Sequence, residues 1–135
     1  MAGETDVQVS RSIRIGGLTI GGVGQTIPAD KHVAIKKTVP KNSTNIQFDV
    51  AADISDAVGM AIEASQDCTV YTNDLSTGTP TDTLSLKKNV PVLWSLGDPV
   101  AAKFLSADVT AVYVTTGSED TKLAFAVAED VTPAF

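Results

Sequence analysis

Apolar and polar residues alternate along most of this chain, in short segments that turn-forming residues separate. Residues 7–15 place apolar side chains at odd positions and polar ones at even positions, and Arg11 interrupts this pattern. Because successive side chains of a strand point to opposite faces, a period of two is typical of a half-buried strand. The alternation recurs at intervals of roughly 8–12 residues, which favours an antiparallel sandwich or barrel over a fold of alternating strands and helices.

Further segments show the same period. They lie at residues 33–39, 46–50, 68–72, 83–86, 90–94, 109–116 and 123–127. Residues 57–65 are ambiguous, because their alanine, methionine and glutamate favour a helix, whereas Gly59 and the spacing of Val58, Met60 and Ile62 favour a strand. We interpret this segment as a strand. The sequence therefore predicts an all-β fold, an antiparallel β-sandwich of about eight short strands.

The chain is expected to form one domain, residues 1–135, because 135 residues can bury about two-thirds of their surface in a single core. Cys68 is the only cysteine, so the core has no internal disulfide to support it. We predict an extended N-terminal arm over residues 1–27, with a strand and then a glycine-rich joint, and a tail over residues 131–135. Neither a signal peptide nor a membrane-spanning segment is expected from the apolar runs.

Charge is distributed unevenly along the sequence. Residues 11–41 hold six basic residues and one acidic residue, a net +5, whereas residues 42–135 hold four lysines and 13 acids, a net −9. Such asymmetry suits docking on an oppositely charged surface or head-to-tail contact between copies, and scatter among solvated side chains is an equally open interpretation. A sequence pI near 4.5 argues against a general nucleic-acid-binding protein.

The sequence offers little to catalysis. The glycine-rich segment 16–24 has neither the Walker spacing nor the dinucleotide fingerprint, so we interpret it as a structural bend. His32 is the only imidazole, and no Gly-x-Ser-x-Gly motif accompanies it. His32 and Cys68 are too few for a structural zinc site, which needs four ligands. We expect no enzyme activity, no catalytic residues and no cofactor.

Acidic and aromatic residues were the remaining candidates for a site. Asp30, Asp49, Asp53 and Asp56 could offer oxygen ligands to Ca²⁺, but their spacing matches no EF-hand, and we interpret them as solvated turn carboxylates without a metal. Trp94, Tyr71 and Tyr113 could stack on sugars if they formed an exposed row. We interpret Trp94 instead as part of the core.

Four segments carry a resemblance to a known family. They are Tyr71-Thr72-Asn73-Asp74, Thr79-Pro80-Thr81-Asp82-Thr83-Leu84-Ser85-Leu86, Val90-Pro91-Val92-Leu93-Trp94 and Ala107-Asp108-Val109-Thr110-Ala111-Val112-Tyr113-Val114-Thr115. Through them the stretch from Val70 to Asp130, a little under half the chain, resembles small proteins of tailed-phage head gene clusters, the capsid decoration (cement) proteins.

This resemblance implies a compact, jelly-roll-like β-sandwich with a structural, non-catalytic role. It implies binding to the major capsid protein on the outside of the virion, often as a homotrimer, after synthesis in the host bacterial cytoplasm. The low pI and the lack of long apolar runs, noted above, lead us to expect no nucleic-acid or membrane partner. An arm of such a protein can add a strand to a neighbouring subunit, and residues 1–27 fit this role. The predicted partner-binding residues are Val7, Val9, Arg11, Ile13, Arg14, Ile15, Lys36 and Lys37.

The alternative interpretation is a carbohydrate- or receptor-binding β-sandwich module of a phage tail or neck component. It requires Trp94 or Tyr71 to be exposed, whereas the decoration role requires a surface suited to identical partners.

Overall fold

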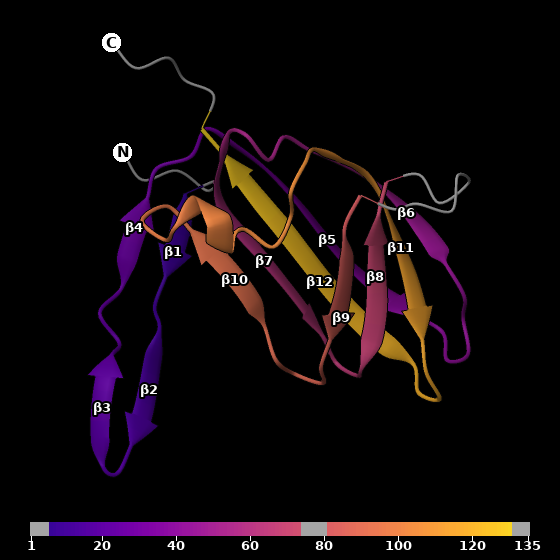
Figure 1. The fold of residues 1–135 in the computed structure, drawn as a ribbon, viewed down its shortest axis with the longest axis horizontal. Coiled ribbons are helices and arrows are strands. Elements are labelled where there is room, and N and C mark those ends of the chain that lie inside the picture. The colour runs from indigo at the N-terminus through magenta and orange to yellow at the C-terminus, as the bar shows by residue number, and fades with distance from the viewer. Residues whose placement is uncertain (1–5, 74–80, 131–135) are drawn as a thin grey trace.

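The computed structural model of the chain describes residues 6–73 and 81–130. These residues form two four-stranded antiparallel sheets that pack face to face, and two small two-stranded sheets near the N-terminus (Figure 1). Sheet I holds, in spatial order, β10 (Val92–Ser95), β7 (Ala57–Ala64), β12 (Thr121–Glu129) and β5 (Lys31–Val39). Sheet II holds β6 (Ile46–Ala52), β11 (Val109–Thr116), β8 (Cys68–Thr72) and β9 (Thr83–Leu86). The predicted all-β sandwich is confirmed.

The connections between these strands follow the jelly-roll pattern. With the sandwich strands numbered one to eight from β5 to β12, sheet I has the order 6-3-8-1 and sheet II the order 2-7-4-5. The chain therefore crosses between the sheets at nearly every connection, and β8 and β9 are the one pair of successive strands within a sheet. Two interleaved Greek keys of this kind define a jelly roll.

The core lies between the two sheets and follows from the alternation. Phe125 of β12 is paired with Ile35 on one side and Ile62 on the other, and all three side chains pack into the main core. The fully buried aliphatic residues around them are Val39, Val70, Leu86, Leu105, Val109, Val112, Val114, Leu123 and Val127. Because both sheets contribute these residues, packing alone accounts for a fold without disulfides.

The ambiguous segment is a strand. Residues 57–64 form β7 in the interior of sheet I, where Met60, Ile62 and Ala64 point into the core. The pairing of β7 with two neighbours supplies more stabilisation than the helix propensity of its alanines. Pro91 directly precedes β10, which is an edge strand as the proline predicted.

A short 3-10 turn, η1 (Val100–Ala102), follows β10, and the carbonyl oxygen of Pro99 just before it accepts a hydrogen bond from the indole N–H of Trp94. Within residues 6–73 and 81–130, no helix has the length and apolar character that crossing a membrane requires. The predicted tail at residues 131–135 lies outside the described residues, as do residues 1–5 of the arm and Asp74, Thr79 and Pro80 of the resemblance.

Candidate docking surfaces

The N-terminal segment is a two-stranded ribbon that turns back on itself. β1 (Val7–Val9) pairs with β4 (Gln25–Ile27), and β2 (Ser12–Ile15) pairs with β3 (Leu18–Gly21). Gly16 and Gly17 form the tip, with φ of 58° and 84°, the signs that a two-residue hairpin turn requires. The prediction of one strand followed by a flexible or bulged glycine-rich connection is therefore wrong in that residues 18–21 and 25–27 are themselves paired strands, although the ribbon does contain a bulge. The glycine-rich part is the returning half of the ribbon.

The base of the ribbon, β1 and β4, packs on the outer face of sheet I. Val7 lies directly over Gly59 of β7, where a Cβ atom would stand only 2.7 Å from the nearest methyl carbon of Val7. Ile27, Val58 and Ala128 are buried together beneath this contact, with Val9 packed against them. The absence of a side chain at Gly59 thus lets the ribbon approach the sheet closely.

A bulge separates the base from the rest of the ribbon. The pairing changes from Val9 with Gln25 to Ser12 with Gly21, so that two residues of the outgoing strand face three of the returning strand. An extra residue of this kind bends a ribbon and increases its twist. Beyond the bulge, β2 and β3 extend away from the sandwich, at the lower left of Figure 1.

Arg11 fixes the ribbon at the bulge. Its Nη1 and Nη2 atoms donate to the two carboxylate oxygens of Asp98 at 3.0 and 2.7 Å, and Nη2 also donates to Ser95 Oγ at 3.0 Å. The Asp98 carboxylate additionally accepts a hydrogen bond from the backbone N–H of Ser95. These contacts lower the pKa of Asp98, with the hydrogen bond from Arg11 as the largest cause and the one from Ser95 next.

The β2–β3 hairpin has one apolar face and one polar face. Ile13 is paired with Ile20, and Ile15 with Leu18, so these four side chains lie on the same side. Their exposed fractions are 57%, 58%, 66% and 64%. Arg14 and its partner Thr19 occupy the opposite side. We call Ile13, Ile15, Leu18 and Ile20 the hairpin face.

A second apolar surface lies on the outer side of sheet I, next to the base of the ribbon. Ala126 of β12 is paired with Ala34 on β5 and with Ala61 on β7, and Ala61 is paired with Leu93 on β10, so one row crosses the whole sheet. Ala124 lies beside this row. We call Ala34, Ala61, Leu93, Ala124 and Ala126 the alanine face. It forms a shallow depression of about 440 Å³ on one side and borders a groove of about 310 Å³ beside β1.

The sequence prediction missed the alanine face, although a signal for it was present. Leu123, Phe125 and Val127 point into the core, and the positions between them are Ala124 and Ala126. A strand with a solvated outer face normally carries polar residues there. Alanine at alternate positions was therefore the observable sign of a second apolar surface.

The predicted partner-binding residues do not form one surface. Val7 and Val9 pack against the protein's own outer sheet, and Arg11 is held by Asp98. Ile13 and Ile15 belong to the hairpin face, and Arg14 lies behind them. Lys36 and Lys37 follow one another on β5, and the ammonium of Lys37 lies 5.9 Å from the centre of the Phe48 ring.

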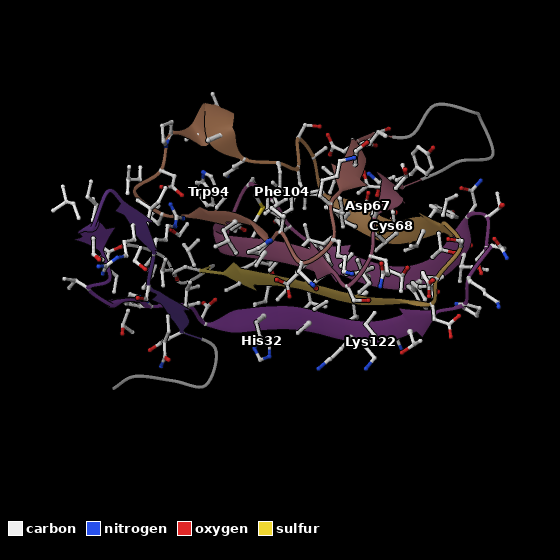
Figure 2. All side chains as sticks on the ribbon, turned by 90° about the horizontal axis from the view of Figure 1, so that it is seen from below. His32, Asp67, Cys68, Trp94, Phe104 and Lys122 are labelled. Atoms are coloured by element: carbon white, nitrogen blue, oxygen red, sulfur yellow. The ribbon has the colours of Figure 1, made fainter. Side chains whose placement is uncertain are left out.

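His32 and Cys68 lie on different sheets. The imidazole of His32 is exposed at the start of β5, and it makes no hydrogen bond with the described residues, although it borders the groove beside β1. Cys68 is buried on β8, and desolvation, as the largest cause, raises the pKa of its thiol. Figure 2 shows His32 pointing away from Cys68 and Trp94.

Acidic residues gather at one end of the sandwich and bond to the protein itself. Buried Glu129 accepts a hydrogen bond from the backbone N–H of Asp53 at 2.6 Å and lies 3.6 Å from the ammonium of Lys31. The hydrogen bonds that Ser55 donates lower the pKa of Asp53, whereas desolvation and the charge of Asp53 raise that of Asp56. Among the described residues, no three His, Cys, Asp or Glu side chains are placed to hold a metal ion together.

Trp94 belongs to the core, as the sequence predicted, and only 3% of its surface is exposed. Its indole N–H donates to the carbonyl oxygen of Pro99 at 3.0 Å, and the ammonium of Lys103 lies 4.7 Å from the ring centre. Its ring is therefore covered by the protein itself. Tyr71 and Tyr113 are half-buried and paired with each other across β8 and β11 in sheet II.

Comparisons with protein families, with curated proteins and with solved structures found no match for this chain. The two apolar surfaces are therefore interpreted from their own geometry.

Proposed function

We propose that the protein is a non-catalytic structural protein of a phage virion, a capsid decoration protein that binds the outside of the shell of major capsid protein and stabilises it. The observation that carries this proposal is the projecting hairpin face, four large aliphatic side chains that the described part of the chain leaves uncovered. Contiguous exposed apolar side chains of this kind mark interaction sites in soluble proteins.

The way in which the hairpin is held supports a docking role. The bulge turns it away from the sandwich, and the bidentate contact of Arg11 with Asp98 fixes it there. A rigidly presented ribbon loses little conformational entropy when it binds, so more of the contact energy appears as affinity. In a shell the same contact is repeated many times, and a high effective concentration then gives strong retention from a modest contact.

The jelly roll supports the proposal more weakly. This architecture occurs in viral capsid domains, and it also occurs in lectins and cupins. Fold alone therefore does not assign a function. The buried position of Trp94 removes one of the two rings on which the carbohydrate-binding interpretation depended, and the other, Tyr71, is half-buried.

The test is to express the chain together with the major capsid protein encoded in the same genome, and to count copies of the chain per sedimented shell. We expect stoichiometric binding by the wild type and a large loss of binding when Ile15 and Leu18 are both replaced by threonine. Arg14→Thr, on the opposite side of the same hairpin, is the matched control and is expected to bind normally. Shells that carry none of the wild-type chain would refute the proposal.

A further inference from the structure

We propose that the hairpin face of one copy docks on the alanine face of a second copy of the same chain. This inference rests on the proposed function and deepens it: the contact would join neighbouring copies on the shell, and the loss of shell binding expected for the hairpin variants would follow from the loss of these links between copies. Each copy would then offer one hairpin and accept another.

The ribbon already makes a contact of this kind within one molecule. Its base covers the outer face of sheet I at Gly59 and Ala128, through Val7, Val9 and Ile27. The alanine face is the direct continuation of that covered area, since Ala126 and Ala61 each lie two residues further along the same strands. On this sheet, branched side chains of the ribbon thus already pack on glycine and alanine within one molecule.

The two surfaces match in chemistry. The hairpin face presents four branched side chains and no charge, because Arg14, the only charged residue of segment 12–21, lies on the other side. The alanine face is a shallow depression lined mainly by alanine, into which branched side chains can settle closely. Its charged neighbours lie on the side of Ala124: Lys36 and Glu63 are the cross-strand partners of Ala124, and Lys122 lies two residues further along β12. An apolar centre with a polar rim is the usual arrangement of a protein interface.

The hairpin of the same molecule does not cover this surface. Arg11 holds the ribbon to Asp98, at the end of sheet I, and β2 and β3 point away from the sandwich (Figure 1). Ala34 and Ala124 are exposed, and Leu93 is 46% exposed. The alanine face is therefore open to another molecule.

The contact joins two different surfaces of the chain. Two copies that exchange hairpins form an isologous dimer, whereas a head-to-tail arrangement gives a closed ring or, where the rotation does not close, open chains.

The first experiment is sedimentation equilibrium of the full chain up to about 1 mM, where even weak self-association is populated. We expect the wild type to associate and to exceed its monomer mass of 14.0 kDa. Ile15→Thr/Leu18→Thr and Ala124→Glu should each lower the association constant at least tenfold. Ile15, Leu18 and Ala124 are exposed, so these variants are expected to keep the sandwich fold.

Two matched controls accompany these variants. Arg14→Thr changes the polar side of the hairpin, and Ser85→Glu introduces the same charge as Ala124→Glu at an exposed position of sheet II. Both controls should associate like the wild type. A wild type that remains monomeric throughout, or controls that lose as much association as the test variants, would overturn the inference.

Mixing the two test variants identifies the geometry. The hairpin variant keeps an intact alanine face, and the face variant keeps an intact hairpin, so an equimolar mixture should form a dimer of one copy of each. Association of Ala124→Glu as strong as that of the wild type would show that hairpins pack on hairpins, which contradicts the inference. A monomeric wild type whose hairpin variants still lose shell binding would refute self-docking and leave the proposed function intact.

Discussion

Gly59→Ala is expected to loosen the N-terminal ribbon without unfolding the sandwich. An added Cβ at this position would stand 2.7 Å from Cγ2 and 2.9 Å from Cγ1 of Val7. Carbon atoms in ordinary contact are about 3.5–4.0 Å apart, so Val7 has to move outward by about 1 Å. The base of the ribbon must follow, because Val7 belongs to β1.

The expected magnitude follows from overpacking, which costs about 1–3 kcal/mol at a well-fitted contact. The gain of roughly 0.5–1 kcal/mol from replacing glycine by alanine acts through the entropy of the unfolded chain, so it does not offset this cost while β7 stays folded. The packing of the ribbon should therefore weaken by about 1–3 kcal/mol, which corresponds to roughly 5- to 150-fold more frequent opening. The main core, to which Met60 and Ile62 contribute from the other side of β7, should be unaffected.

Hydrogen exchange measured by mass spectrometry tests this expectation. Peptides that cover residues 6–28 should exchange faster in Gly59→Ala than in the wild type, and peptides from β11 should exchange at the same rate in both. Val7→Ala supplies the control, since it removes both methyl groups that the new Cβ meets. In the Val7→Ala background the Gly59→Ala substitution should have a much smaller effect, because only the Cβ atom of residue 7, at 3.3 Å, still meets the new Cβ. Unchanged exchange in the single variant, or an equal effect in both backgrounds, would refute the steric argument.

Three further outcomes are expected. Arg11→Gln should accelerate amide hydrogen exchange in the ribbon. The free energy of unfolding should fall by only about 1 kcal/mol or less, because an exposed ion pair is partly screened by water. Unchanged hydrogen exchange would contradict the role of Arg11 in fixing the ribbon. The pKa of Asp98 is lower in the folded protein than in the unfolded chain. Its stabilising contact with Arg11 is therefore present above about pH 3.9 and is lost as the pH falls through the folded pKa. An NMR titration of the Asp98 carboxyl group should give a lower midpoint in the wild type than in Arg11→Gln. Cys68, buried and with a raised thiol pKa, should react with a thiol reagent only as the protein unfolds, and rapid labelling of the native protein would show that β8 opens locally.

The sandwich could be predicted from the sequence because its strands alternate with a period of two. That period fixes which side chains of β12 face the core, and a shift by one residue would reverse it. The assignment of residues 57–64 as a strand was correct for the same reason, since Gly59 disfavours a helix there. Alternation does not show which strands are neighbours, and the jelly-roll order rests on contacts between residues far apart in the sequence.

The ribbon could be predicted only in part. Alternation identified residues 7–15, but the glycines after them hid the returning strand, because glycine carries no side chain to show the period. The decisive contacts are also distant in sequence: Arg11 meets Asp98, and Val7 meets Gly59. Neither pair has a local signature. The sequence therefore identified Ile13 and Ile15 as apolar residues of a strand, but it did not show the direction in which the hairpin holds them.

Three features of the ribbon act on the same property, the direction in which the hairpin face points. Gly59 allows the base of the ribbon to lie close to sheet I, the bulge turns the ribbon, and the pair of Arg11 with Asp98 holds that turn. Because this direction is set before a partner binds, less ordering remains to be done at a contact of the hairpin face. Loss of any one of the three features should therefore weaken binding through the hairpin face even though none of them belongs to that face.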